Sequence, residues 1–147
     1  MTYPDPAVET LLTTQFVAAR IDSAAQREVA RTHQIFWNPT LVILHHHGLR
    51  LREIVGYLPP RLLAPELLVA RGLFDIRRGR PGQAVAIFER VRAEYPDAPV
   101  VPESLYWLGV AASWHHDDKA LLRSAWRELT EGYPQSLWAA KTMLLEE

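Results

Sequence analysis

The amino-acid sequence predicts a small α/β unit followed by an all-α array of helical hairpins. Two observations lead to this prediction. Strand-like apolar runs occur only before the Pro59-Pro60 pair, whereas apolar residues recur at helical spacing after it. The second half also contains an internal repeat, in which Gly72 aligns with Gly109 and Phe88 aligns with Trp126. A repeat of this length is typical of stacked helix pairs.

The boundary between the two modules is expected at the proline pair. We therefore assign residues 1–63 to the α/β module and residues 64–147 to the helical array. With 147 residues and a hydrophobic fraction of 48%, the chain can bury a core in one domain or in two small ones.

The first predicted elements are a helix and a strand. Asp5 and Pro6 form a typical helix start, because aspartate accepts the first N–H groups and proline fits the first turn. A helix is predicted at about 6–14, where apolar residues fall at helical spacing. Phe16–Ile21 is a short apolar run closed by Asp22, which predicts a strand.

A second helix and a hairpin complete the α/β module. Ser23 is the expected cap of a helix over residues 24–34. Thr40–Leu44 is a continuous apolar, β-branched run, typical of a strand buried on both faces. His45–Gly48 is the expected hairpin turn, and Leu49–Val55 is the returning strand.

The second half is predicted to be helical throughout. The expected helices lie at about 60–79, 81–95, 102–115, 118–132 and 136–146. Gly79 is a suitable C-cap, and Pro96 and Pro134 follow predicted helix ends. Pro65 is a candidate interruption of the first helix, because proline donates no helical hydrogen bond.

The internal repeat predicts how these helices pack. A glycine in one helix lets its partner helix approach closely, and an aromatic residue of the partner faces it. Phe88 and Trp126 are therefore expected at equivalent buried positions. The residues assigned to repeat packing are Gly72, Ala84, Phe88, Gly109, Ala125 and Trp126.

One set of small, aromatic and proline residues in the first copy matches the tetratricopeptide pattern. The set is Gly72, Gly79, Ala84, Phe88 and Pro96. The second copy keeps Gly109 and Pro134 but has Leu121 and Trp126 at the small and aromatic positions. This half therefore resembles tetratricopeptide repeats, which implies a helical stack that presents a concave surface to a peptide or helix.

The first half resembles the C-terminal part of the thioredoxin-like fold over about residues 3–63. The most specific match is Asn38-Pro39-Thr40 with the apolar strand that follows, then Gly48 and Gly56-Tyr57. The resemblance implies a cis peptide bond before Pro39. It also implies a cis-proline groove formed by Trp37, Asn38, Pro39 and Thr40.

The chain contains no cysteine, whereas thioredoxin chemistry needs two thiols. The family's first strand and Cys-x-x-Cys motif would lie just before Thr2. That strand normally separates the strands expected here at 16–21 and 40–44. Three arrangements are therefore open: the two strands pair directly in a three-stranded sheet, a strand comes from elsewhere, or the true start lies upstream.

Histidines are the candidate metal ligands. His45 and His47 share a face if the backbone is extended, but two imidazoles without a third fixed ligand make a weak site. The preferred interpretation of His45-His46-His47 is a solvated turn. The run 115–118, His-His-Asp-Asp, lies at a predicted helix–helix loop. No metal and no cofactor is predicted.

The basic and aromatic clusters have structural interpretations. A basic cluster without an aromatic nucleotide platform is interpreted as a solvated helix end; its residues are Arg71, Arg77, Arg78 and Arg80. Four tryptophans at helical positions are expected mostly in the core, namely Trp107, Trp114, Trp126 and Trp138.

Overall composition narrows the function. A net charge of −1 provides no field for nucleic acid or an anionic membrane. No apolar run approaches the roughly 18 residues of a membrane span. The polar N-terminus lacks a secretory pattern, so the cytoplasm is the expected compartment.

No catalytic residue is assigned from the sequence. We expect a non-catalytic thioredoxin-like and helical-repeat protein that mediates protein–protein interaction and forms a homodimer. The alternative is a thiol–disulfide oxidoreductase whose redox cysteines lie upstream of the given start or on a partner chain.

Overall fold

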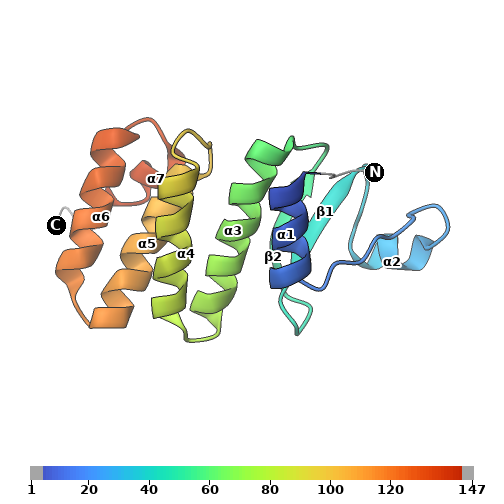
Figure 1. The fold of residues 1–147 in the computed structure, drawn as a ribbon, viewed down its shortest axis with the longest axis horizontal. Helices are drawn as coiled ribbons and strands as arrows, with labels where there is room; N and C mark the ends of the chain where they lie inside the picture. The colour runs from blue at the N-terminus through green and yellow to red at the C-terminus, as the bar shows by residue number, and fades with distance from the viewer. Residues whose placement is uncertain (1–4, 144–147) are drawn as a thin grey trace. The chain divides into compact units, whose positions relative to one another are not determined.

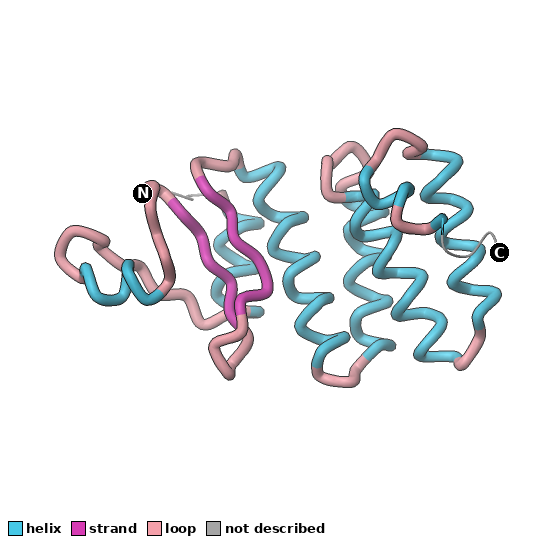
Figure 2. Tube along the Cα trace, turned by 180° about the vertical axis from the view of Figure 1, so that it is seen from behind, coloured by secondary structure: helices cyan, strands magenta, loops and turns pink. Residues whose placement is uncertain are grey.

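The computed structural model describes residues 5–143 (Figure 1). The chain divides into two compact units, Met1–Ala64 and Pro65–Glu147. Within the described residues, two helices precede a β-hairpin, and only helices follow it (Figure 2).

The first unit opens with helix α1, Pro6–Gln15, as predicted. The Asp5 carboxylate accepts hydrogen bonds from the backbone N–H groups of Ala7 at 2.9 Å and Val8 at 3.2 Å. These bonds satisfy two of the donors that a helix start leaves without partners. The helix buries the side chains of Val8 and Leu11.

Helix α2, Arg27–Thr32, is shorter than the predicted 24–34. Asp22 is the reason, because its carboxylate accepts from the N–H of Ala24 at 2.9 Å and holds a turn there instead. Ser23 is not a helix cap. Its hydroxyl accepts a hydrogen bond from the Asn38 side chain at 2.8 Å.

The predicted strand at Phe16–Ile21 is wrong. The segment has no strand structure, and Val17 and Ile21 are exposed. A strand requires a neighbour to accept and donate its backbone hydrogen bonds. The described part of the chain contains only a two-stranded sheet, so direct pairing of this segment with Thr40–Leu44 does not occur.

Strands β1, Thr40–Leu44, and β2, Arg50–Val55, form an antiparallel hairpin, as predicted. The prediction that the first strand is buried on both faces is wrong. Only Ile43 of β1 is buried, while Leu44 is exposed and the remaining residues are half-buried. A strand is buried on both faces only where packed elements cover both sides of its sheet, and the exposed Leu44 lacks such cover.

Five helices account for the rest of the chain: α3, Pro60–Arg77; α4, Pro81–Glu94; α5, Val101–His116; α6, Lys119–Gly132; and α7, Leu137–Ala140. Helix α3 starts in the first unit and continues without a break through Pro65. Gly79 follows it with a φ of +69°, the left-handed geometry expected of a C-cap. The last helix is shorter than the predicted 136–146, and residues 144–146 lie outside the described residues.

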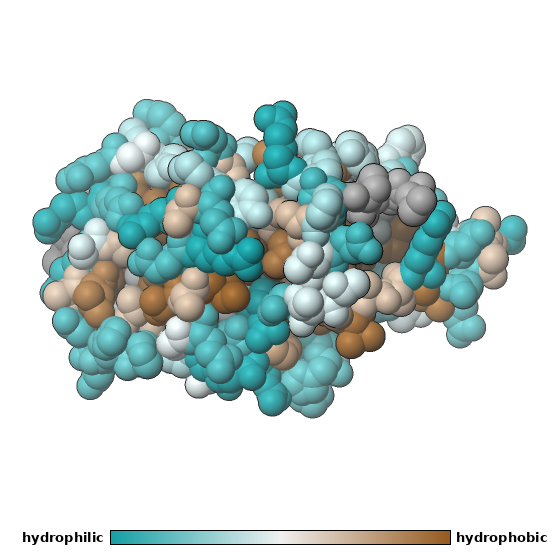
Figure 3. Space-filling model, in the orientation of Figure 1, coloured by the Kyte–Doolittle hydropathy of each residue, from teal (hydrophilic) through white to brown (hydrophobic). Residues whose placement is uncertain are grey.

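The core of the second unit lies along the helix contacts. Helix α5 packs between α4 and α6, and α7 packs against α5 and α6. The side chains of Phe88, Val91, Leu105 and Leu129 are almost completely buried there. On the face shown in Figure 3, apolar residues reach the surface between polar ones.

Candidate functional site

The segment before β1 carries the residues of the expected cis-proline groove. The Asn38–Pro39 peptide bond is cis, as expected. The Thr40 hydroxyl donates to the Trp37 carbonyl at 2.7 Å, and this bond closes the loop onto the start of β1. Trp37, Asn38 and Pro39 are all exposed, so they form a surface loop.

Two large apolar side chains stand out on this loop. Phe36 is 79% exposed and Trp37 is 62% exposed. In the same unit Val17 is fully exposed, in the segment that forms no strand. Phe36 and Trp37 are neighbours in the chain, so the loop before β1 exposes two adjacent large apolar side chains.

The pairing of β1 with β2 fixes the direction of the backbone groups. The Gly56 N–H donates to the Pro39 carbonyl at 2.8 Å, immediately beyond the strands. Hydrogen-bonded pairs alternate along an antiparallel ladder. The N–H and C=O groups of Leu41 and Ile43 are therefore directed toward β2, because both residues follow this pair in steps of two.

The same alternation leaves the other backbone groups of β1 on its outer edge. Thr40 and Val42 direct their N–H and C=O groups away from β2. No second strand pairs with this edge among residues 5–143. The edge therefore offers a short row of backbone donors and acceptors to an added strand.

Side-chain charge distinguishes the two strands. All residues of β1 are uncharged, whereas β2 contains Arg50, Arg52 and Glu53. Arg50 pairs with Glu53 at 2.5 Å and also donates to the carbonyl of His33 at 2.5 Å. Charged residues on an edge strand commonly prevent edge-to-edge pairing, and β1 has no charged residue.

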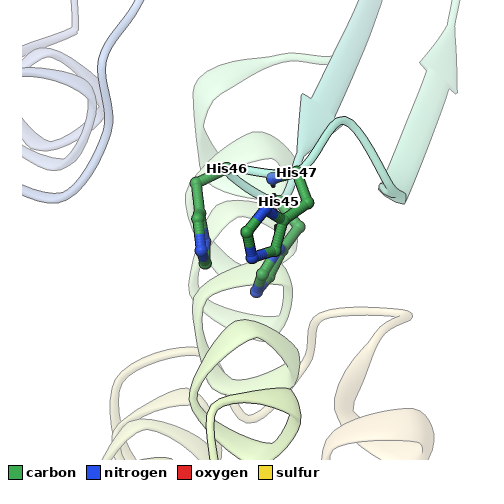
Figure 4. A group of neighbouring side chains, drawn as sticks. All are labelled: His45, His46 and His47. Carbon is green, nitrogen blue, oxygen red and sulfur yellow. Dashed lines mark hydrogen bonds between the residues drawn. The ribbon is translucent and has the colours of Figure 1, made fainter.

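The hairpin turn brings three histidine rings together (Figure 4). The nitrogen atoms of His45, His46 and His47 that could bind a metal all lie within 4.8 Å of one another. Sequence reasoning expected His45 and His47 on one side and did not include His46. The missing signal was the turn geometry, which is not extended at His46 and His47.

The second candidate metal run does not assemble. The rings of His115 and His116 meet edge to face at 4.5 Å. Asp118 instead accepts the N–H of Ala120 at 2.7 Å and caps α6, while Asp117 ends α5 in the left-handed conformation. Among the described residues, the three or more side chains that could together hold a metal ion are those of the histidine turn.

The repeat-packing residues occupy the expected places, with one difference. Ala84 and Phe88 are fully buried and Gly109 is buried. Trp126 and Ala125 are only half-buried, so the predicted equivalence in burial of Trp126 with Phe88 is wrong. Within the second unit α6 packs on α5 and on the very short α7, which covers it less.

Trp126 belongs to an aromatic cluster on α5, α6 and α7. It stacks on Tyr106 at a centroid distance of 4.7 Å and donates from its indole nitrogen to the Tyr106 carbonyl at 3.0 Å. Trp138 lies 5.2 Å from Tyr106, and Lys141 lies 3.7 Å over the Trp138 ring. Trp114, by contrast, is 63% exposed, against the expectation of a core position.

The basic cluster at the end of α3 contains a buried acceptor that the sequence analysis missed. Asp75 is 1% exposed and pairs with Arg71 at 3.0 Å and Arg80 at 2.6 Å. Two of the four arginines therefore have a structural role. The signal in the sequence was the four-residue spacing of Arg71 and Asp75 on one helix.

Comparison with known proteins gives no relative. No protein-family model matches the chain, and neither a curated protein nor a solved structure shows significant similarity to it. Among the described residues, no helix is both long enough and apolar enough to cross a membrane.

Proposed function

We propose that this chain is a non-catalytic protein-interaction module of thioredoxin-like and tetratricopeptide-like organisation, and that its binding surface is the outer edge of β1. The proposal rests on the outer edge of β1, which carries no charged residue and pairs with no second strand among the described residues. The exposed rings of Phe36 and Trp37 precede it directly in the chain.

The partner on this edge is an extended polypeptide segment. Strand addition supplies hydrogen bonds to the outward N–H and C=O groups of Val42 and Thr40, and neighbouring apolar side chains add contact area. Leaving such groups without partners next to apolar side chains is unfavourable, so an added strand stabilises the unit.

The first partner to consider is a second copy of the chain. Two β1 strands can pair antiparallel about a twofold axis that passes beside Val42, because an outward-directed residue can exchange both hydrogen bonds with its own copy. The result is a four-stranded sheet with the charged β2 strands at its two outer edges. No like charges meet at the new seam, since β1 is uncharged.

The helical unit supports the same role. Trp114 and Leu137 are exposed apolar residues that could take part in further protein contacts. Its repeats provide a rigid scaffold, since the glycine-to-ring contacts fix how the helices pack.

Proline substitution at position 42 tests the proposal. Val42→Pro removes the outward N–H while sparing the hydrogen bonds to β2, and edge strands tolerate proline. Val42→Thr is the matched control, because it keeps the N–H and the branched side chain. By light scattering after size exclusion, we expect the wild type and Val42→Thr to have twice the 16.8 kDa chain mass, and Val42→Pro to have a single chain mass.

Two results would contradict the proposal. A dimeric Val42→Pro variant with native circular dichroism would show that β1 is not the interface. A wild type that stays at 16.8 kDa at micromolar concentration would show that the chain does not pair with itself.

A further inference from the structure

We infer that the turn between β1 and β2 binds a divalent transition-metal ion of the zinc class, with His45, His46 and His47 as its protein ligands. This site is separate from the strand edge and does not depend on the proposed function. Figure 4 shows the three rings gathered on one side of the turn.

The distances between the rings fit a metal site after a small adjustment. Their centroids lie 4.0 Å apart for His45 and His46, 3.8 Å for His46 and His47, and 5.3 Å for His45 and His47. Zinc–nitrogen bonds of about 2.0–2.1 Å in a tetrahedral site place two ligand nitrogens roughly 3.4 Å apart. The nitrogens already lie within 4.8 Å, so the widest pair closes by about 1.4 Å.

The turn holds the backbone of the three histidines in place. The Gly48 N–H donates to the His45 carbonyl at 2.8 Å, and the His45 N–H donates to the Leu49 carbonyl at 2.7 Å. Gly48 adopts a φ of +81°, which glycine accepts without strain. This pattern is a three-residue hairpin loop closed by a glycine in the left-handed conformation. His46 and His47 lie in this loop, and His45 lies immediately before it.

The three ligands differ in burial. His45 is 9% exposed and is therefore held by its surroundings, whereas His46 and His47 are exposed. The His47 N–H donates to Nδ1 of His45 at 3.4 Å, a long bond that metal coordination would replace. One buried ring and two exposed rings on the same short turn place all three ligands close to the geometry that a metal ion needs.

The donor atoms select the metal. Three neutral imidazoles suit Zn²⁺, Ni²⁺ and Cu²⁺, whereas Mg²⁺ and Ca²⁺ require oxygen ligands. Affinity should follow the usual order for nitrogen sites, with Cu²⁺ above Zn²⁺. Three ligands leave a fourth tetrahedral position for water.

Calorimetric titration of the tag-free chain with Zn²⁺ tests the inference. At about pH 7.5 we expect one ion per chain, with weaker binding on acidification because protons compete with the metal ion for the imidazole nitrogens. The double variant His46→Ala, His47→Ala removes two exposed ligands and should lower the affinity by at least about tenfold, the lower end of the effect seen for outer-shell partners of metal ligands. Ca²⁺ should give no heat of binding.

The chain offers a matched control in its second histidine pair. His115→Ala, His116→Ala removes the same number of exposed imidazoles from α5 and should leave zinc affinity unchanged. Equal affinities of the wild type and the His46, His47 variant would overturn the inference, as would loss of binding in the control alone.

A spectroscopic measurement gives an independent readout. The electron paramagnetic resonance spectrum of the Cu²⁺-loaded chain should show coupling to several nitrogen nuclei, and this coupling should be lost in the His46, His47 variant. A spectrum with oxygen ligands only, in the wild type, would also overturn the inference.

Discussion

The ring of Phe88 occupies the space in which Gly72 would carry a side chain. A β-carbon placed on Gly72 would lie 2.6 Å from both Cε1 and Cζ of this fully buried ring. The relation recurs one repeat later, where a β-carbon on Gly109 would lie 3.0 Å from Cδ1 of Trp126. Each glycine therefore sets the distance between its helix and the next one.

Gly72→Ala should destabilise the chain. The added methyl cannot fit without moving the Phe88 ring, and overpacking of this kind costs about 1–3 kcal/mol. Gly132→Ala is the control, because a β-carbon there meets no atom within 4 Å and should be neutral or stabilising by about 0.5–1 kcal/mol. Urea unfolding followed by circular dichroism measures both, and equal effects would contradict the contact with Phe88.

Phe88→Ala should have a larger effect. Phe88 is fully buried between helices, and removal of such a ring costs about 3–5 kcal/mol. Trp126→Ala should cost less, because Trp126 is half-buried at the equivalent position. A larger loss at Trp126 than at Phe88 in the same unfolding assay would reverse the burial seen in the structure.

Asp75→Asn should weaken the join between α3 and α4. The carboxylate is buried and binds Arg71 and Arg80, and breaking a buried pair costs about 3–5 kcal/mol, reduced here because both arginines reach solvent. Glu94→Gln is the control, since its pair with Arg90 is almost half exposed and should contribute less than about 1 kcal/mol. Thermal unfolding of both variants makes the comparison, and similar losses would refute a structural role for Asp75.

The sequence was sufficient for elements with a local cause. Asp5 capped α1, Gly79 ended α3, and helical spacing located the helices in the described part of the second half, although α7 is shorter than predicted. The strand predicted at Phe16–Ile21 failed because its formation depends on a neighbour that local patterns do not supply.

The candidate sites also combine features that the sequence predicts with features that depend on the three-dimensional structure. The cis peptide bond before Pro39 was expected from the resemblance, and the strand after it was expected from the apolar run. The sequence did not predict that His46 joins His45 and His47 in one cluster, because this grouping depends on the geometry of the turn. The pairing of Asp75 with Arg80 also depends on the chain reversal after α3, although the pairing with Arg71 follows from helical spacing.

The chain as given should have no disulfide reductase activity. It contains no cysteine, and no other side chain can carry out thiol exchange. Insulin reduction with dithiothreitol measures this activity, with a two-cysteine thioredoxin as the positive control. Turnover of insulin above the reductant-only rate by a clean preparation would contradict the prediction.

Amide hydrogen exchange at the middle of β1 tests most directly whether its outer edge is a protein-binding surface. The N–H groups of Leu41 and Ile43 are directed toward β2, so their protection should not depend on protein concentration. The Val42 N–H is directed outward, so it should be protected in a concentrated sample and exchange faster on dilution. Concentration-dependent protection at Val42, and not at Leu41 or Ile43, is the predicted result. Rapid exchange of Val42 at every concentration that light scattering shows to be dimeric would contradict the strand-edge interface.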